Sequence, residues 1–438
     1  MSTKARIAKS LAVVSAVALF AGCGGTPSPS GTAPGGTGEK TEITFLWLWG
    51  EAEDQVLREL VTEFNAAQDK IHVTGVSSPD TVAQLTAMTS STGSFDVSDF
   101  FGNSTAAWAE MGILEPLDDY IARDNFDTSD FIPETLAQNV YNGKTYALPL
   151  SAITQQLYYN KDLLAEAGYD RPPQTLEELA EYTQKLTKVN DQGAITQLGL
   201  AGPWAGVIIN PLTIAHGGSF FGLDDGASGP QPDNPGAWEA LNFWNDNVLK
   251  PFGADKVLEF TAGFGAQFTP DYPLYNGKVA MFIDGAYHNA QIPIYAPDLN
   301  YGVAPIPHPA AKPELAGSVG IDNSTFFIPA NSQNKDAAWE FVKFLYQKEN
   351  LLRFNKSQTN LPPLKSALDD PIWDDLPEGF GVFLESLRSP NLRYSPAQPW
   401  NAEFSNDLNV IFDDFTSGRA GVDETMQKAK TAAERFQS

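Results

Sequence analysis

Cysteine is almost absent from this chain: Cys23 is the only one among its 438 residues. The part of the chain after Cys23 therefore has no disulfide bond, and zinc sites built from several thiolates are excluded. Because no covalent cross-link stabilises the folded part, its stability must come from hydrophobic cores in domains of considerable size. With 42% hydrophobic residues, the chain has enough apolar material for two or three such domains.

Basic residues are also scarce. Lysine and arginine number 28 against 54 aspartates and glutamates, which gives a formal net charge of −26. A surface of this sign repels phosphate backbones, so we expect no nucleic-acid partner, and polyanionic ligands are disfavoured. The charge says little about a neutral ligand, and most of the acidic residues are expected to form a solvated surface.

Motifs for metal binding and catalysis are missing as well. The four histidines, His72, His216, His288 and His308, lack metal-ligand spacing, and the sequence contains no HExxH, no GxSxG and no Walker pattern. We therefore expect no metal, no cofactor and no enzymatic activity. Residue counts alone do not exclude a pair of carboxylates placed for glycoside hydrolysis.

The apolar run Leu11 to Phe20 is too short to span a bilayer comfortably. A basic stretch precedes it and the small residues Ala21 and Gly22 follow, which is typical of an export signal. The small residues end at Cys23, and this ending resembles the lipobox of bacterial lipoproteins, with Phe20 at the position where leucine is usual. The resemblance implies a lipoprotein signal peptide over 1–22 and a diacylglycerol thioether on Cys23 as the membrane anchor. The alternative is an ordinary secretory signal with a chance cysteine.

Residues 23–41 are expected to form a flexible tether, because Gly24 to Gly38 are almost entirely Gly, Ser, Thr and Pro. Order begins at a strand pattern over 42–49. A helical pattern over 51–68 follows, and a second strand pattern covers 71–74. Strand, helix and strand over this length predict a βαβ unit and hence a parallel sheet.

The rest of the chain continues the alternation of strands and helices. Further strands are expected at 95–101, 278–284 and 326–328, and further helices at 82–88, 106–111, 175–188, 237–248, 334–347 and 422–436. The fold class predicted from these patterns is α/β.

Four stretches carry a family resemblance through their order and spacing. They are Asn142–Pro149 with Leu157–Leu164, Gly277–Tyr287, Phe327–Phe341, and Asn360–Ser366. In this order, behind a lipobox, they resemble the extracellular solute-binding proteins of bacterial ABC sugar importers, the maltose-binding-like group. The resemblance covers nearly everything from about residue 42 to the end.

The resemblance implies a two-lobe, periplasmic-binding-protein-like fold with three hinge crossings and a ligand cleft between the lobes. Carried onto this sequence, the crossings fall near 148–156, 301–307 and 359–364. Lobe 1 then comprises 42–150 and 308–357, and lobe 2 comprises 151–307 and 358–438.

A pocket for a neutral sugar needs flat apolar platforms and a few directed polar groups. Tryptophan and tyrosine supply such platforms, and the chain has nine and fourteen of them. Trp49 and Glu51 follow the first strand, where ligands collect in open α/β sheets, so we expect both to contact the ligand. Trp47 is the more suitable core residue of the two tryptophans.

The resemblance supplies further candidates. Asn103 follows the third strand, Gln155 faces the cleft at the first crossing, and Trp204 lies in a loop that brings an aromatic residue to the sugar. Tyr287 takes the place of a stacking aromatic residue. Asp284 is either a hydroxyl acceptor or a helix cap.

Three more candidates lie in the last third of the chain. Asp322 and Asn323, with Ser324, stand where relatives commonly have two glycines and a tryptophan, so they are candidates for a different set of sugar contacts. Trp400 is near the family's last aromatic contact, with core packing as the alternative.

These observations predict a monomeric, lipid-anchored substrate-binding protein on the outer face of the cell membrane. It would capture a carbohydrate, an oligosaccharide by preference, through hinge closure and deliver it to the transmembrane subunits of an ABC permease. The alternatives are a surface glycan-binding lectin without a transporter, a binding protein for a polyol or glycerol phosphate, and a secreted glycosidase.

Overall fold

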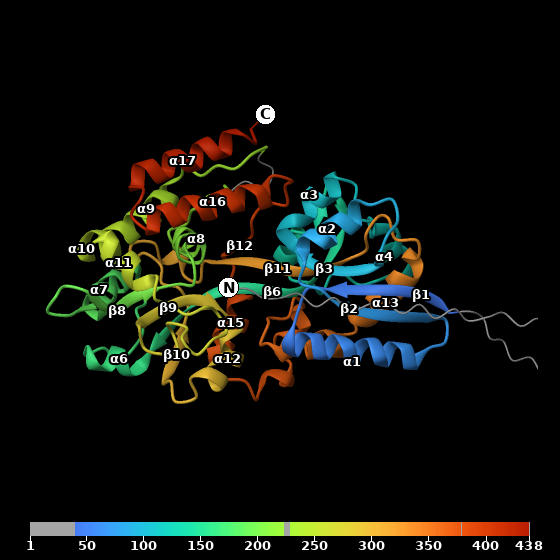
Figure 1. The fold of residues 1–438 in the computed structure, drawn as a ribbon, viewed down its shortest axis with the longest axis horizontal. Helices are drawn as coiled ribbons and strands as arrows, with labels where there is room; N and C mark the ends of the chain where they lie inside the picture. Colours follow the sequence, from blue (N-terminus) through green and yellow to red (C-terminus); the bar gives the residue numbers. More distant parts are fainter. Residues whose placement is uncertain (1–39, 223–227, 378, 438) are drawn as a thin grey trace, which may run out of the picture. The chain divides into compact units, whose positions relative to one another are not determined.

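The computed structural model describes residues 40–222, 228–377 and 379–437. It is a mixed α/β fold in which helices lie on both sides of a long sheet (Figure 1). The predicted signal peptide, the predicted lipidation site Cys23 and almost all of the predicted tether lie outside the described residues.

The elements fall into three runs along the chain. The first run comprises β1 (Thr41–Trp47), α1 (Glu51–Ala67), β2 (Ile71–Ser77), α2 (Thr81–Thr89), β3 (Val97–Phe101), the 3₁₀ turn η1 (Gly102–Ser104), α3 (Thr105–Glu110), α4 (Asp118–Asp124), α5 (Pro133–Ala137), β4 (Val140–Tyr141) and β5 (Lys144–Thr145). The second run comprises β6 (Ala147–Asn160), α6 (Lys161–Glu166), α7 (Leu176–Leu186), β7 (Lys188–Val189), β8 (Ile195–Ala201), α8 (Ala205–Ala215), α9 (Pro235–Trp244), the π-helical segment η2 (Asn245–Leu249), α10 (Lys250–Phe252), α11 (Ala254–Thr261), β9 (Val279–Gly285), α12 (His288–Tyr295) and β10 (Tyr301–Ala304). The third run comprises η3 (Pro313–Leu315), β11 (Val319–Phe327), α13 (Lys335–Leu345), α14 (Lys348–Ser357), η4 (Lys365–Ala367), η5 (Pro371–Trp373), α15 (Gly379–Ser386), β12 (Leu392–Arg393), α16 (Asn401–Thr416) and α17 (Val422–Glu434).

The predicted βαβ unit is confirmed. Strands β1 and β2 pair in parallel, and α1 connects them. Alternate residues of β1 are buried, as expected for a strand with one face against a core. Trp47, the last residue of β1, has no solvent exposure, so its predicted place in the core is also confirmed.

Strand β6 joins the two halves of the main sheet, whose strand order is β2-β1-β3-β11-β6-β9-β8-β7. Up to Thr154 it pairs with β11, and from Gln155 onward it pairs with β9. Figure 1 shows β6 and β11 running between one group of helices around β1 to β3 and another around β8 and β9. The segment predicted as the first crossing, 148–156, therefore lies inside one continuous strand.

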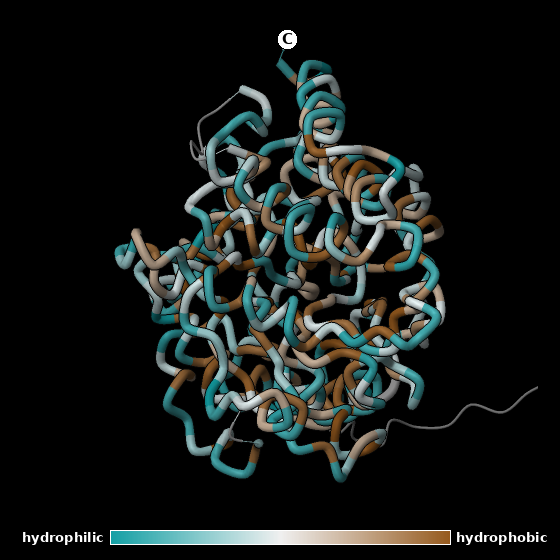
Figure 2. Tube along the Cα trace, turned by 90° about the vertical axis from the view of Figure 1, so that its left-hand side faces the viewer, coloured by the Kyte–Doolittle hydropathy of each residue, from teal (hydrophilic) through white to brown (hydrophobic). Residues whose placement is uncertain are grey.

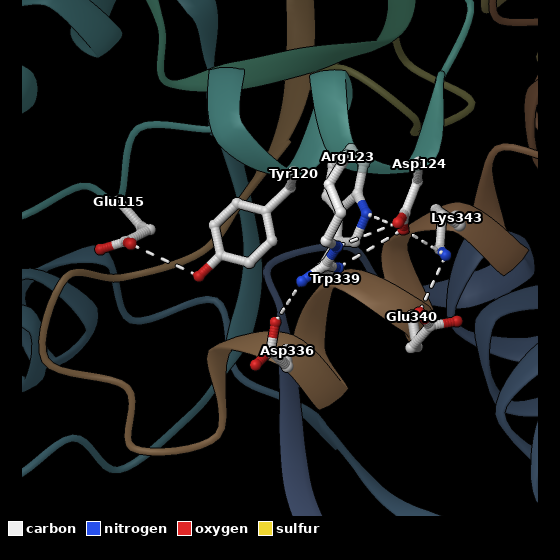
Figure 3. Close-up of polar contacts among 8 residues, drawn as sticks. All are labelled: Glu115, Tyr120, Arg123, Asp124, Asp336, Trp339, Glu340 and Lys343. Carbon is white, nitrogen blue, oxygen red and sulfur yellow. Dashed lines mark hydrogen bonds and ion pairs between the residues drawn. The ribbon is translucent and has the colours of Figure 1, made fainter.

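Polar contacts tie α4 to α13, which are more than 200 residues apart in the sequence (Figure 3). Asp124 accepts hydrogen bonds from Trp339 Nε1 at 2.9 Å and from Lys343 Nζ at 2.5 Å. Arg123 donates to Asp336 at 2.6 Å. The hydrogen bonds from Arg123 and Lys343 hold the pKa of the Asp124 carboxyl below its usual range. The third run of elements therefore returns to pack on the first.

The core runs through both halves of the sheet and includes the large buried rings of Phe45, Tyr158, Phe282, Phe326 and Trp339. In the hydropathy colouring of Figure 2, hydrophilic segments follow much of the outside of the trace and hydrophobic segments lie between them. This arrangement agrees with a chain that must rely on apolar burial for its stability.

One strand is much longer than its sequence pattern predicts. The strand expected at 326–328 is the end of β11, which begins at Val319. Its middle carries Asp322, Asn323 and Ser324, and a run of polar residues hides a strand from any search for alternating apolar positions. The polar run matters because it faces the site described next.

Candidate functional site

A cavity of about 620 Å³ lies where several strands of the main sheet end, which is the region where open α/β sheets bind ligands. Its volume falls within the usual range for small-molecule sites. The lining comes from the turn after β1, the end of β3, the middle of β6, the start of α8, the loop before β9, the turn after β9, the middle of β11 and the segment after α14. Segments from all three runs of the chain therefore meet in one place.

Aromatic rings form much of the cavity wall. Trp49 and Phe101 meet edge to face with ring centroids 5.8 Å apart, and Phe268 and Tyr287 do the same at 5.7 Å. Trp204, the residue before α8, lines the cavity with 48% of its surface exposed. Exposed rings of this size in a cavity offer flat apolar surfaces to a ligand.

The polar part of the lining is rich in amides. Asn103 and Gln155 line the cavity, as do four amides that the sequence did not single out: Gln267, Gln291, Gln358 and Asn360. Each side-chain amide both donates and accepts hydrogen bonds, which suits a ligand that carries many hydroxyl groups.

Among the described residues that line this cavity, two carry acidic side chains and none is Lys, Arg or His. The acidic residues are Glu53 and Asp322. Asp322 is exposed into the cavity, and partial desolvation of its carboxyl group there raises the pKa of this group. The electrostatics of the cavity favour a neutral ligand over an anionic one.

A buried amide network supports the β11 side of the cavity. Gln138 donates to the backbone oxygen of Ile321 at 3.0 Å and to Asp322 Oδ1 at 3.3 Å. Asn323 donates in turn to Gln138 Oε1 at 2.7 Å. These bonds fix Asp322 and Asn323 to α5 and its neighbourhood, so their side chains are held in place before any ligand arrives.

A second buried network stands behind Tyr287. Asp284 accepts hydrogen bonds from the Tyr287 hydroxyl, from Tyr272 at 2.5 Å and from the backbone N–H of Gly285 at 2.8 Å. His288 Nε2 lies 2.6 Å from the same carboxyl, and because a carboxylate only accepts, this nitrogen donates. Burial, and then the nearby Asp284 charge, raise the pKa of the Tyr287 hydroxyl well above its usual range.

A smaller and more polar pocket of about 220 Å³ adjoins the main cavity. Asn103, Gln155, Trp204, Val207 and Asp322 line both, so the two form one connected cleft. The smaller pocket adds, from α8, α16 and β12, the side chains of Asn210, Thr213, Ser405, Asn409 and Arg393.

The structure brings most of the predicted site residues together. The main cavity is lined by Trp49, Asn103, Gln155, Trp204, Tyr287, Asp322 and Asn323. Their contact with a ligand stays a prediction, but seven positions spread over more than 270 residues share one cavity.

Two of the other three predicted residues lie outside the described lining, and the side chain of the third is not described. Asp284, expected to be either a hydroxyl acceptor or a helix cap, is fully buried behind Tyr287 and accepts a hydrogen bond from its hydroxyl. Trp400 is 7% exposed and packs edge to face on Phe404 at 6.3 Å, which agrees with the core-packing alternative. Glu51 is the first residue of α1, and its side chain lies outside the described structure.

Sequence reasoning missed two aromatic residues of the lining. Phe101 ends β3, so the rule that ligands collect at strand ends could have found it. Phe268 lies in the loop between α11 and β9 and no sequence signal marked it.

Within residues 40–222, 228–377 and 379–437, no helix is long and apolar enough to cross a membrane. The same described residues contain no group of three or more His, Cys, Asp or Glu side chains that could hold a metal ion.

Residues 49–351 match the family model of the bacterial extracellular solute-binding proteins. The chain belongs to this family. Its members bind solutes and are not enzymes, so the predicted absence of catalysis follows from membership. The family membership also supports the predicted α/β fold with two lobes and a ligand cleft, and it fits a location outside the cytoplasm.

Curated relatives bind different solutes. A maltotriose-binding protein of Pyrococcus abyssi is 28% identical over 326 residues, which are 73% of this chain and 66% of the relative. The sn-glycerol-3-phosphate-binding periplasmic protein of Salmonella typhimurium is 26% identical over 354 residues, 76% of this chain and 77% of the relative. Among solved structures, CpMnBP1 with bound mannobiose has a TM-score of 0.76 and 25% identity, and the match covers 90% of this chain and all of that chain.

Proposed function

We propose that this solute-binding protein captures a neutral carbohydrate, an oligosaccharide by preference, and delivers it unchanged to the transmembrane subunits of an ABC permease. The similarity to a maltotriose-binding protein and to a mannobiose-bound structure supports a sugar as the solute.

The single observation that carries the proposal is the composition of the main cavity. Exposed aromatic rings and several amides line it, while none of its described lining residues is a cation. Stacking surfaces suit the C–H faces of sugar rings, and amides suit their hydroxyl groups. A phosphate ligand would need Arg or Lys partners, and the described part of this lining has neither.

The connected smaller pocket supports a ligand of more than one ring. A sugar ring in the main cavity can continue past Trp204 into a space lined by hydroxyl and amide side chains. A monosaccharide would leave one of the two spaces filled with water.

The second candidate is a binding protein for glycerol phosphate, because a relative with that ligand aligns over three quarters of this chain. Arg393 in the smaller pocket is the cation that such a ligand would use. Because none of the described residues that line the main cavity is a cation, this is the weaker candidate.

The membrane anchor and the division into two lobes are also part of what we propose. Lipidation at Cys23, a signal peptide over 1–22 and a tether over 23–41 would hold a monomeric binding protein at the outer face of the membrane. Lobe 1 would comprise 42–150 and 308–357, and lobe 2 would comprise 151–307 and 358–438. The division of β6 between β11 and β9 and the contacts between α4 and α13 support these boundaries.

A thermal-shift screen tests the proposal, because a ligand that binds only the folded state raises the melting temperature. The panel contains glucose, mannobiose, maltotriose, raffinose, glycerol and sn-glycerol 3-phosphate. We expect the largest shift from a di- or trisaccharide. A shift with sn-glycerol 3-phosphate alone would establish the second candidate instead.

A further inference from the structure

Phe268 has a backbone conformation that a phenylalanine rarely adopts. Its φ is +61°, in the left-handed region. The other described non-glycine residues with positive φ are Asn125, Asn142 and Thr359. Asparagine tolerates this region, and Thr359 is held in it by a hydrogen bond from its hydroxyl to the backbone oxygen of Ala286 at 2.9 Å. For a bulky aromatic residue the conformation is strained, and such strain collects at functional sites.

The surrounding loop holds Phe268 in this conformation. The backbone N–H of Gly265 donates to the oxygen of Asp271 at 3.1 Å and closes the loop at its base. A Cβ on Gly265 would lie 2.5 Å from the carbonyl carbon of Asp271, so the base accommodates only glycine without a shift. Thr269 Oγ1 also bonds the oxygen of Ala266 at 2.6 Å. A strained residue persists where its neighbours determine the conformation this fully.

The strain does not serve to bury the ring. Phe268 is 40% exposed, and it lines the main cavity. Its ring meets that of Tyr287 edge to face at 5.7 Å, and Tyr287 is itself fixed by the buried Asp284. Burial of the ring therefore does not account for the strained backbone of Phe268.

We propose that Phe268 is a ligand-contacting residue whose ring, with that of Tyr287, forms a two-sided aromatic corner for one sugar ring of the bound carbohydrate. The strained loop is retained because it presents this ring to the cavity. The inference rests on the proposed function and adds to it a specificity-determining residue that neither the sequence patterns nor the family resemblance marked.

Three variants at this position separate the ring from the strain. Phe268→Ala removes the ring and keeps a Cβ, Phe268→Gly removes the ring and relieves the strain, and Phe268→Tyr keeps both. Phe264→Ala is the matched control, because Phe264 lies in the same loop region but packs on Phe260 at 5.6 Å rather than in the cavity. Melting temperatures are measured without ligand, and affinities are measured by calorimetry with the panel sugar that binds wild type most tightly.

We expect the Ala and Gly variants to bind that sugar about tenfold more weakly or worse, and the Tyr variant and the Phe264 control to bind within about twofold of wild type. Without ligand, the Gly variant should melt about 1–2 °C above the Ala variant, because only glycine is relaxed at this φ. Unchanged affinity in both ring-deletion variants would overturn the inference while leaving the proposed function intact.

The melting temperatures measured without ligand test the inference about Phe268 even if no sugar in the panel binds. In that case the proposed function fails, but a large loss of melting temperature in Phe268→Ala, equal to that of Phe264→Ala, would show that the ring is core packing and would overturn the inference separately. A small change is the result expected for a ring that serves a ligand.

Discussion

Asp284 accepts a hydrogen bond from the hydroxyl of Tyr287, and the two residues differ in access to the cavity: Tyr287 lines it, whereas Asp284 has no solvent exposure. A carboxylate that no ligand can reach therefore fixes the orientation of a ring that a ligand can reach. The sequence placed both residues in the site, and the structure gives them different tasks.

Replacing Asp284 with Asn should lower both stability and affinity. One carboxylate oxygen becomes an N–H₂ group, so two of the four donors around it lose their acceptor in a buried place. We expect a loss of about 2–4 kcal/mol in the free energy of unfolding, measured by urea titration. The sugar affinity should fall as the Tyr287 ring loosens.

Asp162→Asn is the control for this variant. Asp162 accepts a hydrogen bond from Asn300 at 2.7 Å on the exposed surface, where the loss of charge has little effect. If Asp284→Asn is as stable as Asp162→Asn, the carboxylate does not anchor the ring.

Trp204 should matter for affinity more than for stability. Its side chain is 48% exposed and lines both parts of the cleft. We expect Trp204→Ala to weaken sugar binding by at least about tenfold, measured by calorimetry, and to change the melting temperature only slightly. Trp238→Ala is the matched control, because Trp238 packs on the core and lies outside the cleft. Equal affinities for the two variants would exclude Trp204 from the site.

Asn409 tests whether the ligand reaches the smaller pocket. It projects from α16 into that pocket, and the main cavity does not include it. We expect Asn409→Ala to weaken binding of a trisaccharide severalfold and to leave monosaccharide binding unchanged. Val410→Ala, at the next and highly exposed position of the same helix, should bind like wild type. If Asn409→Ala weakens the affinity for sugars of every length by the same factor, the result would contradict a cleft made of two parts.

Asp99 should give the protein a measurable dependence on pH. Burial raises the pKa of this carboxyl group to about 7. In the unfolded chain the pKa is about 4. At a pH between these two pKa values, the folded state holds one more proton than the unfolded state. The contribution of Asp99 to the free energy of unfolding therefore falls as the pH rises from the lower pKa to the higher one. Asn cannot titrate, but its oxygen can still accept from the backbone N–H of Leu48, which donates to Asp99 at 2.9 Å.

The free energy of unfolding of Asp99→Asn, relative to that of wild type, should therefore increase from about pH 4 to about pH 7, by up to roughly 4 kcal/mol. Urea titrations at several pH values measure it. A difference that is constant over this range would mean that Asp99 ionises normally in the folded protein.

Much of the fold is predictable because its signals are local. The aromatic and branched residues of β1 and the helical spacing of apolar residues in α1 predict both elements to within two residues of their observed bounds. Trp47 could be assigned to the core because it continues the buried face of the strand. In contrast, β11 was predicted only at its apolar end, because its polar middle has no pattern that local reasoning can use.

The site was predictable where a residue follows a strand and unpredictable where it depends on distant packing. Trp49 and Tyr287 each stand two residues after the end of a strand, β1 and β9, and both line the cavity. Asp284 belongs to the same segment as Tyr287, but only the three-dimensional arrangement of Tyr272 and His288 shows that its carboxylate is buried among their side chains. Phe268 depends on a loop closed by Gly265 and Asp271, and neither residue identifies a binding loop by its type.

Small-angle X-ray scattering of the chain with and without a saturating panel sugar tests the central claim most directly. If two halves of the sheet joined by β6 close around a carbohydrate, the radius of gyration falls when the sugar is added, and the same chain without sugar is the reference. A radius of gyration that is unchanged at full saturation would contradict capture by closure and would favour a rigid glycan-binding lectin.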